Sequence, residues 1–167
     1  MSGVSAARVA LGSAAGVNVA TGVAVLDHLL EELAEAGRLS LQLELAPDEP
    51  EAEIGQAGAA FGHALVPLLE SPEAAGRGFG IAPAHEALAM VVLEASGRPL
   101  VASNADLSST RVGGIRSDIA ATFLDELSKA AGLTIHVRLT EGENSQHVLS
   151  AIFKALGIAL RRACSTL

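Results

Sequence analysis

A repeated order of helix, strand and helix is the feature that most constrains how this chain can fold. The last apolar segment, NSQHVLSAIFKALGIALRR at residues 144–162, has a fainter copy in EAEIGQAGAAFGHAL at residues 51–65. Gly157 in the late copy and Gly62 in the early one stand 95 residues apart. A chain that repeats one unit in this way is expected to fold as two similar half-domains that share a core.

A shorter helix and a strand precede each copy. Apolar residues recur three and four positions apart over residues 23–36 and 117–131, which predicts an amphipathic helix in both segments. Gly37 and Gly132 follow these helices and are expected to end them in the left-handed conformation. The alternating leucines after Gly37 then predict a strand with one buried face, and the residues after Gly132 repeat that pattern.

The remaining local signals concern turns and linkers. Residues 1–20 alternate loosely around a Gly-rich turn, which predicts a short hairpin. Residues 70–80 are interpreted as the linker between the halves, and residues 96–98 as the tight turn of a second hairpin. Ser117 is the expected N-cap of the second short helix.

Together these patterns predict an α+β fold made by internal duplication. Each half has a β-sheet covered on one face by two helices, with half-domains at residues 1–70 and 71–167 of one compact domain. Half of the residues are hydrophobic, yet the chain has four Phe and no Trp or Tyr. The core must therefore be built from closely packed small aliphatic side chains. A mean hydropathy of +0.41 also favours burial of apolar surface between subunits.

Composition also excludes several functional classes. No apolar run is long enough to span a bilayer, and the N-terminal residues do not resemble a signal peptide, so we expect a cytoplasmic protein without membrane contact. A single cysteine, Cys164, excludes an internal disulfide. The formal charge of −8 argues against a nucleic-acid partner, because no basic stripe is present to neutralise phosphates.

Four sequence segments resemble one family of enzymes. They are TGVAVLDHLLEEL at 21–33, HEALAMVVLEASGRPL at 85–100, RVGG at 111–114 and NSQHVLSAIFKA at 144–155. In order and spacing they resemble imidazoleglycerol-phosphate dehydratase of histidine biosynthesis. The resemblance implies a ribosomal protein S5 domain 2-like fold and a lyase reaction at two manganese ions. It also implies trimers that join into a large shell through metal sites between subunits.

The resemblance assigns manganese ligands to positions where this chain has mostly lost them. Two His-His-x-x-Glu motifs, one at the start of each long helix, fall on residues 51–55 and 146–150. The first keeps none of its ligands and the second keeps only His147. With His28 and His136 elsewhere, three imidazoles remain as residual metal ligands. We therefore expect no manganese cofactor, or at most weak manganese binding.

Other family positions are kept in part. Arg98 and Lys154 match residues that contact the substrate phosphate, so a small phosphorylated ligand is a possible partner. Glu86 matches an acid of the active-site region and is the candidate catalytic residue, while His85 stands where the family has Asp. From the residues alone, His28, His136 and His147 are equally well explained as solvated surface side chains. Lys154 can likewise be a residue whose aliphatic stem lies along its apolar helix while the ammonium group reaches water.

Three hypotheses about function follow. The favoured one is a catalytically inactive or impaired relative of the dehydratase, a pseudoenzyme that serves as a binding or regulatory protein and associates with itself as a homotrimer or in a larger shell. The second is an active enzyme, either the dehydratase with a rebuilt centre or a different reaction that uses Glu86, His85, Arg98 and Lys154. The third is a nucleic-acid or protein-binding module, which the acidic charge disfavours.

Overall fold

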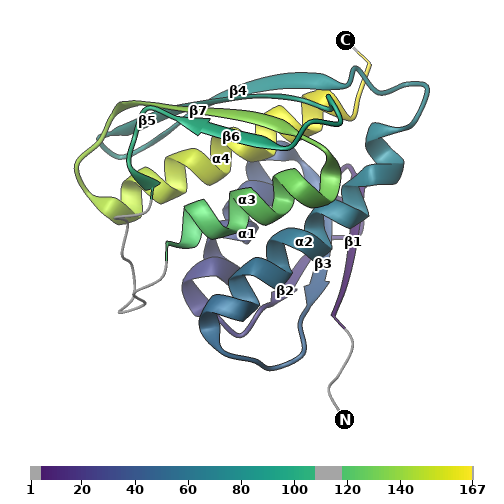
Figure 1. Cartoon of the computed structure of the whole chain (residues 1–167), viewed down its shortest axis with the longest axis horizontal. Helices are drawn as coiled ribbons and strands as arrows, with labels where there is room; N and C mark the ends of the chain where they lie inside the picture. Colours follow the sequence, from purple (N-terminus) through teal and green to yellow (C-terminus); the bar gives the residue numbers. More distant parts are fainter. Residues whose placement is uncertain (1–4, 108–117, 167) are drawn as a thin grey trace.

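The computed structural model describes residues 5–107 and 118–166 of the 167-residue chain (Figure 1). The expected N-cap Ser117 and the RVGG segment at 111–114 lie outside the described residues. The first half contains β1 (Ala6–Leu11), β2 (Val17–Ala20), α1 (Ala24–Gly37), β3 (Leu39–Glu44) and α2 (Pro50–Leu69). The second half contains β4 (Arg77–Ala84), β5 (Ala87–Glu94), β6 (Leu100–Ser103), α3 (Ile119–Ala131), β7 (Thr134–Glu141) and α4 (Ser145–Ala163).

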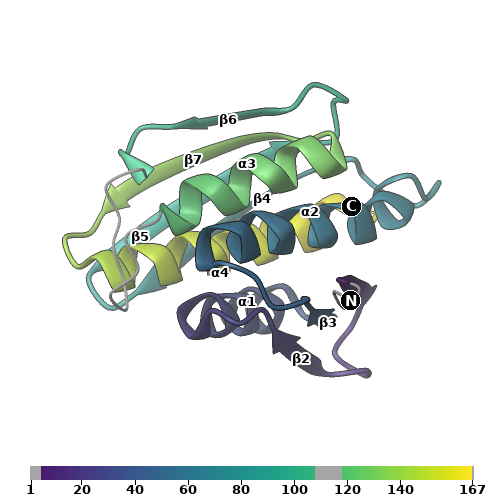
Figure 2. The same ribbon diagram turned by 60° about the horizontal axis from the view of Figure 1, so that its bottom comes forward.

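Two sheets form the outer layers of the molecule, and the helices lie between them (Figure 2). The first sheet has the strand order β1-β3-β2 and the second has the order β4-β5-β7-β6. Helices α1 and α2 cover the inner face of the first sheet, and α3 and α4 cover that of the second. The two helix layers then meet, α1 against α4 and α2 against α3. The predicted α+β fold, with both helices of each half on one face of its sheet, is confirmed.

A helix that spans a bilayer must be both long and apolar. None of the helices within residues 5–107 and 118–166 satisfies both conditions.

The internal duplication is visible in the pattern of buried positions. Every buried residue of α1 has a buried counterpart in α3, 94 residues later. Every buried residue of α2 has one in α4, 95 residues later. The central strands agree as well, because β3 and β7 hold equivalent places in their sheets and bury residues 94 positions apart. This register confirms the predicted equivalence of α1 with α3 and of α2 with α4, and it leaves β4 as an addition to the second half.

The first helix ends differently from the prediction. Arg38, with φ 51°, takes the left-handed conformation after α1, and Gly132, with φ 67°, takes it after α3. Gly37 is instead the last residue of the helix, where the absence of a side chain allows α4 to come close. A Cβ at this position would lie 2.3 Å from the carbonyl oxygen of Gly157. The pairing of Gly37 with Gly132 was therefore wrong by one residue, and Arg38 is the equivalent of Gly132.

Three predictions about strands are also wrong. β1 and β2 do not pair as a hairpin, because β3 lies between them, and β6 is likewise separated from β5 by β7. In both halves a helix connects two parallel neighbours, β2 to β3 and β6 to β7, and this crossover places the helix on the sheet. The hairpin of the second half is formed by β4 and β5, so residues from Arg77 onward belong to a strand and not to the linker.

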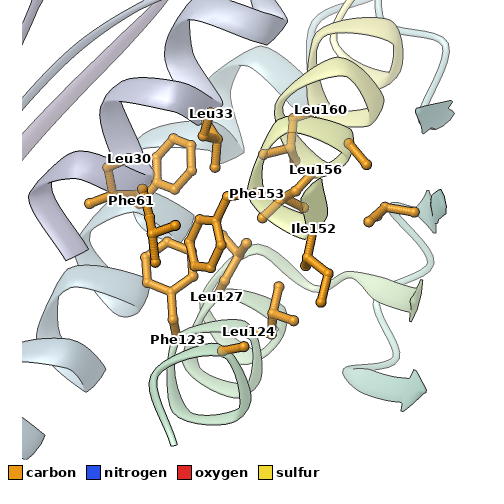
Figure 3. Packing of buried hydrophobic residues seen from close by; sticks show 14 of the residues in the cluster. Leu30, Leu33, Phe61, Phe123, Leu124, Leu127, Ile152, Phe153, Leu156 and Leu160 are labelled. Carbon is orange, nitrogen blue, oxygen red and sulfur yellow. The ribbon is translucent and has the colours of Figure 1, made fainter. Parts of the chain in front are cut away.

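The core extends from the inner face of one sheet through the helix layers to the inner face of the other, and it is filled mainly by Leu, Ile, Val and Ala. Phe61, Phe123 and Phe153 are fully buried at its centre (Figure 3). The ring centroids of Phe61 and Phe123 are 6.2 Å apart, and those of Phe123 and Phe153 are 5.3 Å apart. These rings come from α2, α3 and α4, so the aromatic cluster joins the two halves.

Facing helices touch through their backbones. A Cβ at Gly157 in α4 would lie 2.0 Å from the carbonyl oxygen of Leu33 in α1. The equivalent contact recurs at Gly62 in α2, where a Cβ would lie 3.0 Å from the carbonyl oxygen of Leu127 in α3. A side chain at Gly157 would therefore force α1 and α4 apart.

We expect Gly157→Ala to lower the free energy of unfolding by about 1–3 kcal/mol, because the added methyl group overlaps the Leu33 backbone. Denaturant unfolding measures the effect. The matched control is Gly55→Ala in α2, where the nearest atom to the new Cβ is 3.6 Å away. The control should be neutral or gain up to about 1 kcal/mol from the higher helix propensity of Ala. Equal effects of the two substitutions would contradict the close-contact interpretation.

Candidate functional site

Glu86 and His147 meet where the β4–β5 turn approaches the start of α4. Asn144 caps this helix, since its side-chain oxygen accepts hydrogen bonds from the backbone N–H groups of Gln146 and His147. One carboxylate oxygen of Glu86 accepts hydrogen bonds from the backbone N–H groups of Glu143 and Asn144, at 3.2 and 3.0 Å. The other oxygen contacts Nδ1 of His147. The loop before α4 therefore holds the Glu86 carboxylate in a defined position.

This environment keeps Glu86 in its charged form. Hydrogen bonds from the Asn144 backbone, from His147 and from the Glu143 backbone lower the pKa of Glu86 from 4.5 to about 2. Near neutral pH the carboxylate has no proton to donate, so Glu86 is unsuited to act as a general acid. Its contact with Nδ1 instead orients the His147 ring and leaves Nε2 of that ring for another partner.

A second imidazole completes this group. The rings of His85 and His147 stack with their centroids 4.2 Å apart. His85 reaches this position through a left-handed backbone conformation, with φ 52°, in the two-residue turn between β4 and β5. The sequence places His85 next to Glu86, but it does not predict the contact with His147, because that contact depends on how the β4–β5 hairpin folds over α4.

The second group of functional side chains lies between α1 and α4, and we call it the Glu32 cluster: His28, Glu32, Ser150 and Lys154. The side chain of Glu32 is 15% exposed. Its Oε1 accepts a hydrogen bond from Oγ of Ser150 at 2.8 Å and lies 3.2 Å from Nε2 of His28. Its Oε2 lies 3.6 Å from Nζ of Lys154. One half-buried carboxylate thus collects a hydroxyl group, an imidazole and an ammonium group.

A hollow of about 230 Å³ adjoins this cluster at the beginnings of α1 and α4. Its polar lining comes from His28 and Gln146, and the other lining residues are apolar: Ala24, Val25, Leu29 and Leu149. The fold therefore brings one position of the second His-His-x-x-Glu motif next to His28.

The other predicted site residues lie elsewhere in the chain. His136 is exposed on the outer face of the second sheet, in register with Val92 of β5 and Ala102 of β6. Arg98 lies beyond the end of β5, whereas Glu86 precedes its start, and an eight-residue strand spans roughly 25 Å. Arg98 is held there by its backbone, because Thr134 donates a hydrogen bond to its carbonyl oxygen. Within one chain, His28, His136 and His147 occupy three different locations.

Comparison with known proteins identifies the family. The family model of imidazoleglycerol-phosphate dehydratase matches residues 21–160. The chain belongs to the imidazoleglycerol-phosphate dehydratase family. It is 37% identical over 160 residues to imidazoleglycerol-phosphate dehydratase of Prochlorococcus marinus strain MIT 9313, covering 93% of this chain and 77% of that protein. It is 37% identical over 159 residues to the enzyme of Desulfitobacterium hafniense strain Y51, covering 90% and 81%.

Solved structures of the family have the same fold. The chain is similar to imidazoleglycerol-phosphate dehydratase from Staphylococcus aureus N315 with a TM-score of 0.86 and 30% identity, over 96% of this chain and 93% of the other. It is similar to the dehydratase from Pyrococcus furiosus in complex with (S)-C348 with a TM-score of 0.85, over 100% and 94% of the two chains. The second pair is 24% identical, so this likeness bears on the fold alone.

The positions that the family resemblance assigns to the glutamate ligands do not supply a donor set for two manganese ions. Gly55 has no side chain, and a Cβ there would face Cγ of Glu126 at 3.6 Å. Oγ of Ser150 donates a hydrogen bond to Oε1 of Glu32. Across residues 5–107 and 118–166 of one chain, no three His, Cys, Asp or Glu side chains are placed to hold a metal ion. The two positions that the resemblance assigns to glutamate ligands therefore offer no carboxylate to a metal ion.

Sequence reasoning missed Glu32, the central residue of the second group. A signal for it was present, because His28 and Glu32 are four residues apart and therefore lie on one face of a helix. Nothing in the sequence indicated that this face would meet Ser150 and Lys154, which are more than a hundred residues away. That contact depends on the packing of α1 against α4.

The depressed pKa of Glu86 predicts how stability depends on pH. A carboxyl group whose pKa falls from 4.5 to about 2 on folding stabilises the folded state above pH 4.5, and this contribution is lost as pH falls toward 2. We expect Glu86→Gln to lower the melting temperature near pH 7, and the difference from the unsubstituted protein to shrink between pH 4.5 and 2. Thermal unfolding across this range measures it, with Glu73→Gln as an exposed control in the connection between α2 and β4. A difference that does not vary with pH would contradict the assignment.

Proposed function

We propose that this chain is a member of the imidazoleglycerol-phosphate dehydratase family that is catalytically inactive or strongly impaired. The observation that carries the proposal is the donor chemistry at the two equivalent glutamate positions of the long helices. One is Gly55, and the other is Ser150, whose hydroxyl group is bonded to Glu32. Neither offers the charged oxygen that a manganese site of this kind requires.

The histidine positions of the same motifs support this interpretation. The first motif has Glu51 and Ala52 in place of its two imidazoles, and the second has Gln146 in place of one. Only His147 is kept, and its ring is oriented by Glu86. A carbon acid as weak as the family substrate loses its proton with difficulty unless a strong electrophile stabilises the product, and these residues supply none.

One specific observation favours the alternative hypothesis that the protein is an active enzyme. The contact of Glu86 with Nδ1 of His147 gives that ring the fixed orientation found in ligating and proton-transferring histidines. The His85 ring stacks against it, so two imidazoles and one carboxylate lie together at this end of the molecule. A dehydratase with a rebuilt centre, or a related enzyme with a different reaction, is therefore the alternative, and it shares the test described below.

Ligand binding in this proposal involves the remaining cations. Lys154 matches a phosphate-contacting position, but its ammonium group lies 3.6 Å from Glu32 and is partly neutralised. Arg98 is exposed at the other end of β5 and keeps its charge available. A small phosphorylated ligand would therefore bind more weakly here than at a site where both cations are free of carboxylate partners. A cytoplasmic location completes the proposal and agrees with a single cysteine, Cys164, that is buried and free.

Self-association into a homotrimer is the second part of the proposal. Among the described residues, the outer face of the second sheet carries large apolar side chains that are partly exposed. Four of them are between 41% and 53% exposed: Phe79, Ile81, Val92 and Leu100. Phe79 is held in place by Arg162, whose guanidinium carbon lies 4.7 Å from the ring centroid and whose Nη1 donates to the Phe79 carbonyl oxygen. An apolar face of this kind favours burial by another protein surface.

A second copy of the chain suits this face because the face carries both charges. Arg77 stands opposite Glu94 in the β4–β5 register, and Arg138 stands opposite Met90 in the β5–β7 register. Copies related by symmetry can therefore pair positive with negative groups around an apolar centre. The family resemblance favours three copies, and a larger shell would require further contacts.

We expect the purified protein to bind less than a full pair of manganese ions per chain and to show no dehydration of imidazoleglycerol phosphate above background. Elemental analysis after dialysis against manganese, together with a product assay, measures both quantities. The family member from Staphylococcus aureus serves as a positive control. A stoichiometric pair of ions with turnover would establish the active-enzyme alternative.

We expect light scattering to report a trimer in manganese-free buffer and in buffer with manganese, because the apolar contact does not depend on metal. Phe79→Glu, which places a charge on the apolar face, should shift the protein to monomers. Arg8→Glu on the outer face of the first sheet is the matched control and should leave the trimer intact. A monomeric wild-type protein, or a Phe79→Glu variant that stays trimeric, would refute this surface.

A further inference from the structure

The Glu32 cluster contains its own positive charge. Glu32 on α1 faces Ser150 and Lys154 on α4, and those two residues are one helical turn apart. Both of their polar groups point at the carboxylate, at 2.8 Å for the hydroxyl oxygen and 3.6 Å for the ammonium nitrogen. Because the Glu32 side chain is 15% exposed, water screens this ion pair less than it screens a pair on the surface.

We infer that Lys154 is a built-in counter-cation of Glu32 that keeps divalent cations out of the space between α1 and α4. A metal ion bound to Glu32 would share the carboxylate with the ammonium group of Lys154, and the two positive charges would repel each other at short range. The hydroxyl hydrogen of Ser150 also points toward the carboxylate, which suits an anion and opposes a cation at the same place. The inference rests on the proposed function in one respect, the loss of the family's metal chemistry in this chain.

Removal of the ammonium group should convert the cluster into a cation site. His28 and Glu32 are four residues apart on α1, and Nε2 of His28 lies 3.2 Å from Oε1 of Glu32. An imidazole nitrogen and a carboxylate oxygen at this spacing are suitable ligands for one transition-metal ion. Gln146 lines the adjoining hollow with His28, and its side-chain amide contains a neutral oxygen. Without Lys154, the half-buried carboxylate lacks its counter-charge, and a divalent cation can supply it.

The equivalent place in the other helix pair shows that this cluster is not imposed by the fold. Glu126 in α3 stands 94 residues after Glu32, but the α2 position that faces it is Gly55, the equivalent of Ser150. Glu126 forms an ion pair with Lys129 on the same helix, at 3.9 Å, and both side chains are at least 40% exposed. Lys129 also pairs with Asp125 at 2.9 Å. The chain's second lysine therefore provides a control with the same chemistry in a solvated setting.

The experiment measures melting temperature and bound manganese for the full-length protein and four variants, with MnCl₂ alone as the probe. The variants are Lys154→Met, Lys154→Gln, Glu32→Gln with Lys154→Met, and Lys129→Met. Bound manganese is read from the loss of the free-ion signal in electron paramagnetic resonance. Circular dichroism confirms that each variant is folded. Lys154→Gln keeps a donor for Glu32 without the charge, so it preserves the test if the methionine variant does not fold.

We expect the wild-type protein and Lys129→Met to show no manganese-dependent change in melting temperature. Lys154→Met should melt about 3–6 °C lower without metal, and millimolar manganese should restore at least half of this loss. Lys154→Gln should respond in the same direction. The double variant should bind no manganese, because the carboxylate ligand is gone.

Two results would overturn the inference. One is a wild-type protein that binds manganese at the cluster as tightly as Lys154→Met does. The other is folded Lys154→Met and Lys154→Gln variants that show no response to manganese. Turnover by the wild-type protein would instead overturn the proposed function, so the failure of one proposal is distinct from the failure of the other.

Discussion

The close approach of facing helices is the constraint on which the rest of this structure depends. Gly157 lets α4 rest directly on the backbone of α1 at Leu33, and Gly62 permits the equivalent contact of α2 with α3. At such short separations even a small side chain spans the gap, so the hydroxyl group of Ser150 reaches the carboxylate of Glu32. Bulkier residues at the glycine positions would separate the helices and break this contact. The helix packing thus creates the polar cluster as well as the core.

The duplicated scaffold carries two different outcomes at equivalent places. Between α1 and α4 a carboxylate, a hydroxyl group and an ammonium group form one half-buried network. Between α2 and α3 the equivalent positions hold Glu126 and Gly55, and the carboxylate is solvated. The core positions of the two halves are conserved in their burial, while these polar positions have diverged. A fold can therefore keep its packing while the chemistry placed on it changes.

The two outer sheet faces have diverged in the same way. On the first sheet, Arg8, Gln42 and Asn18 form a polar cross-strand row. On the second sheet the equivalent row contains Val92 and His136, and the additional strand β4 extends it with Phe79. A polar face is stable in water, whereas an apolar face gains free energy when another surface covers it. The molecule therefore has one polar outer face and one outer face that is partly apolar.

The sequence by itself determined the duplication, the fold class and the family, because these depend on periodic apolar positions and on motifs that are local in the chain. It also pointed to Glu86, His147, His28 and Lys154 as chemically important. It did not determine which strands pair, since β3 inserts between β1 and β2 only when α1 crosses over the sheet. Nor did it reveal that Glu32 joins His28 to Lys154, or that His85 stacks on His147. Those contacts join residues distant in the sequence, and only the packing of helices and hairpins brings them within bonding distance.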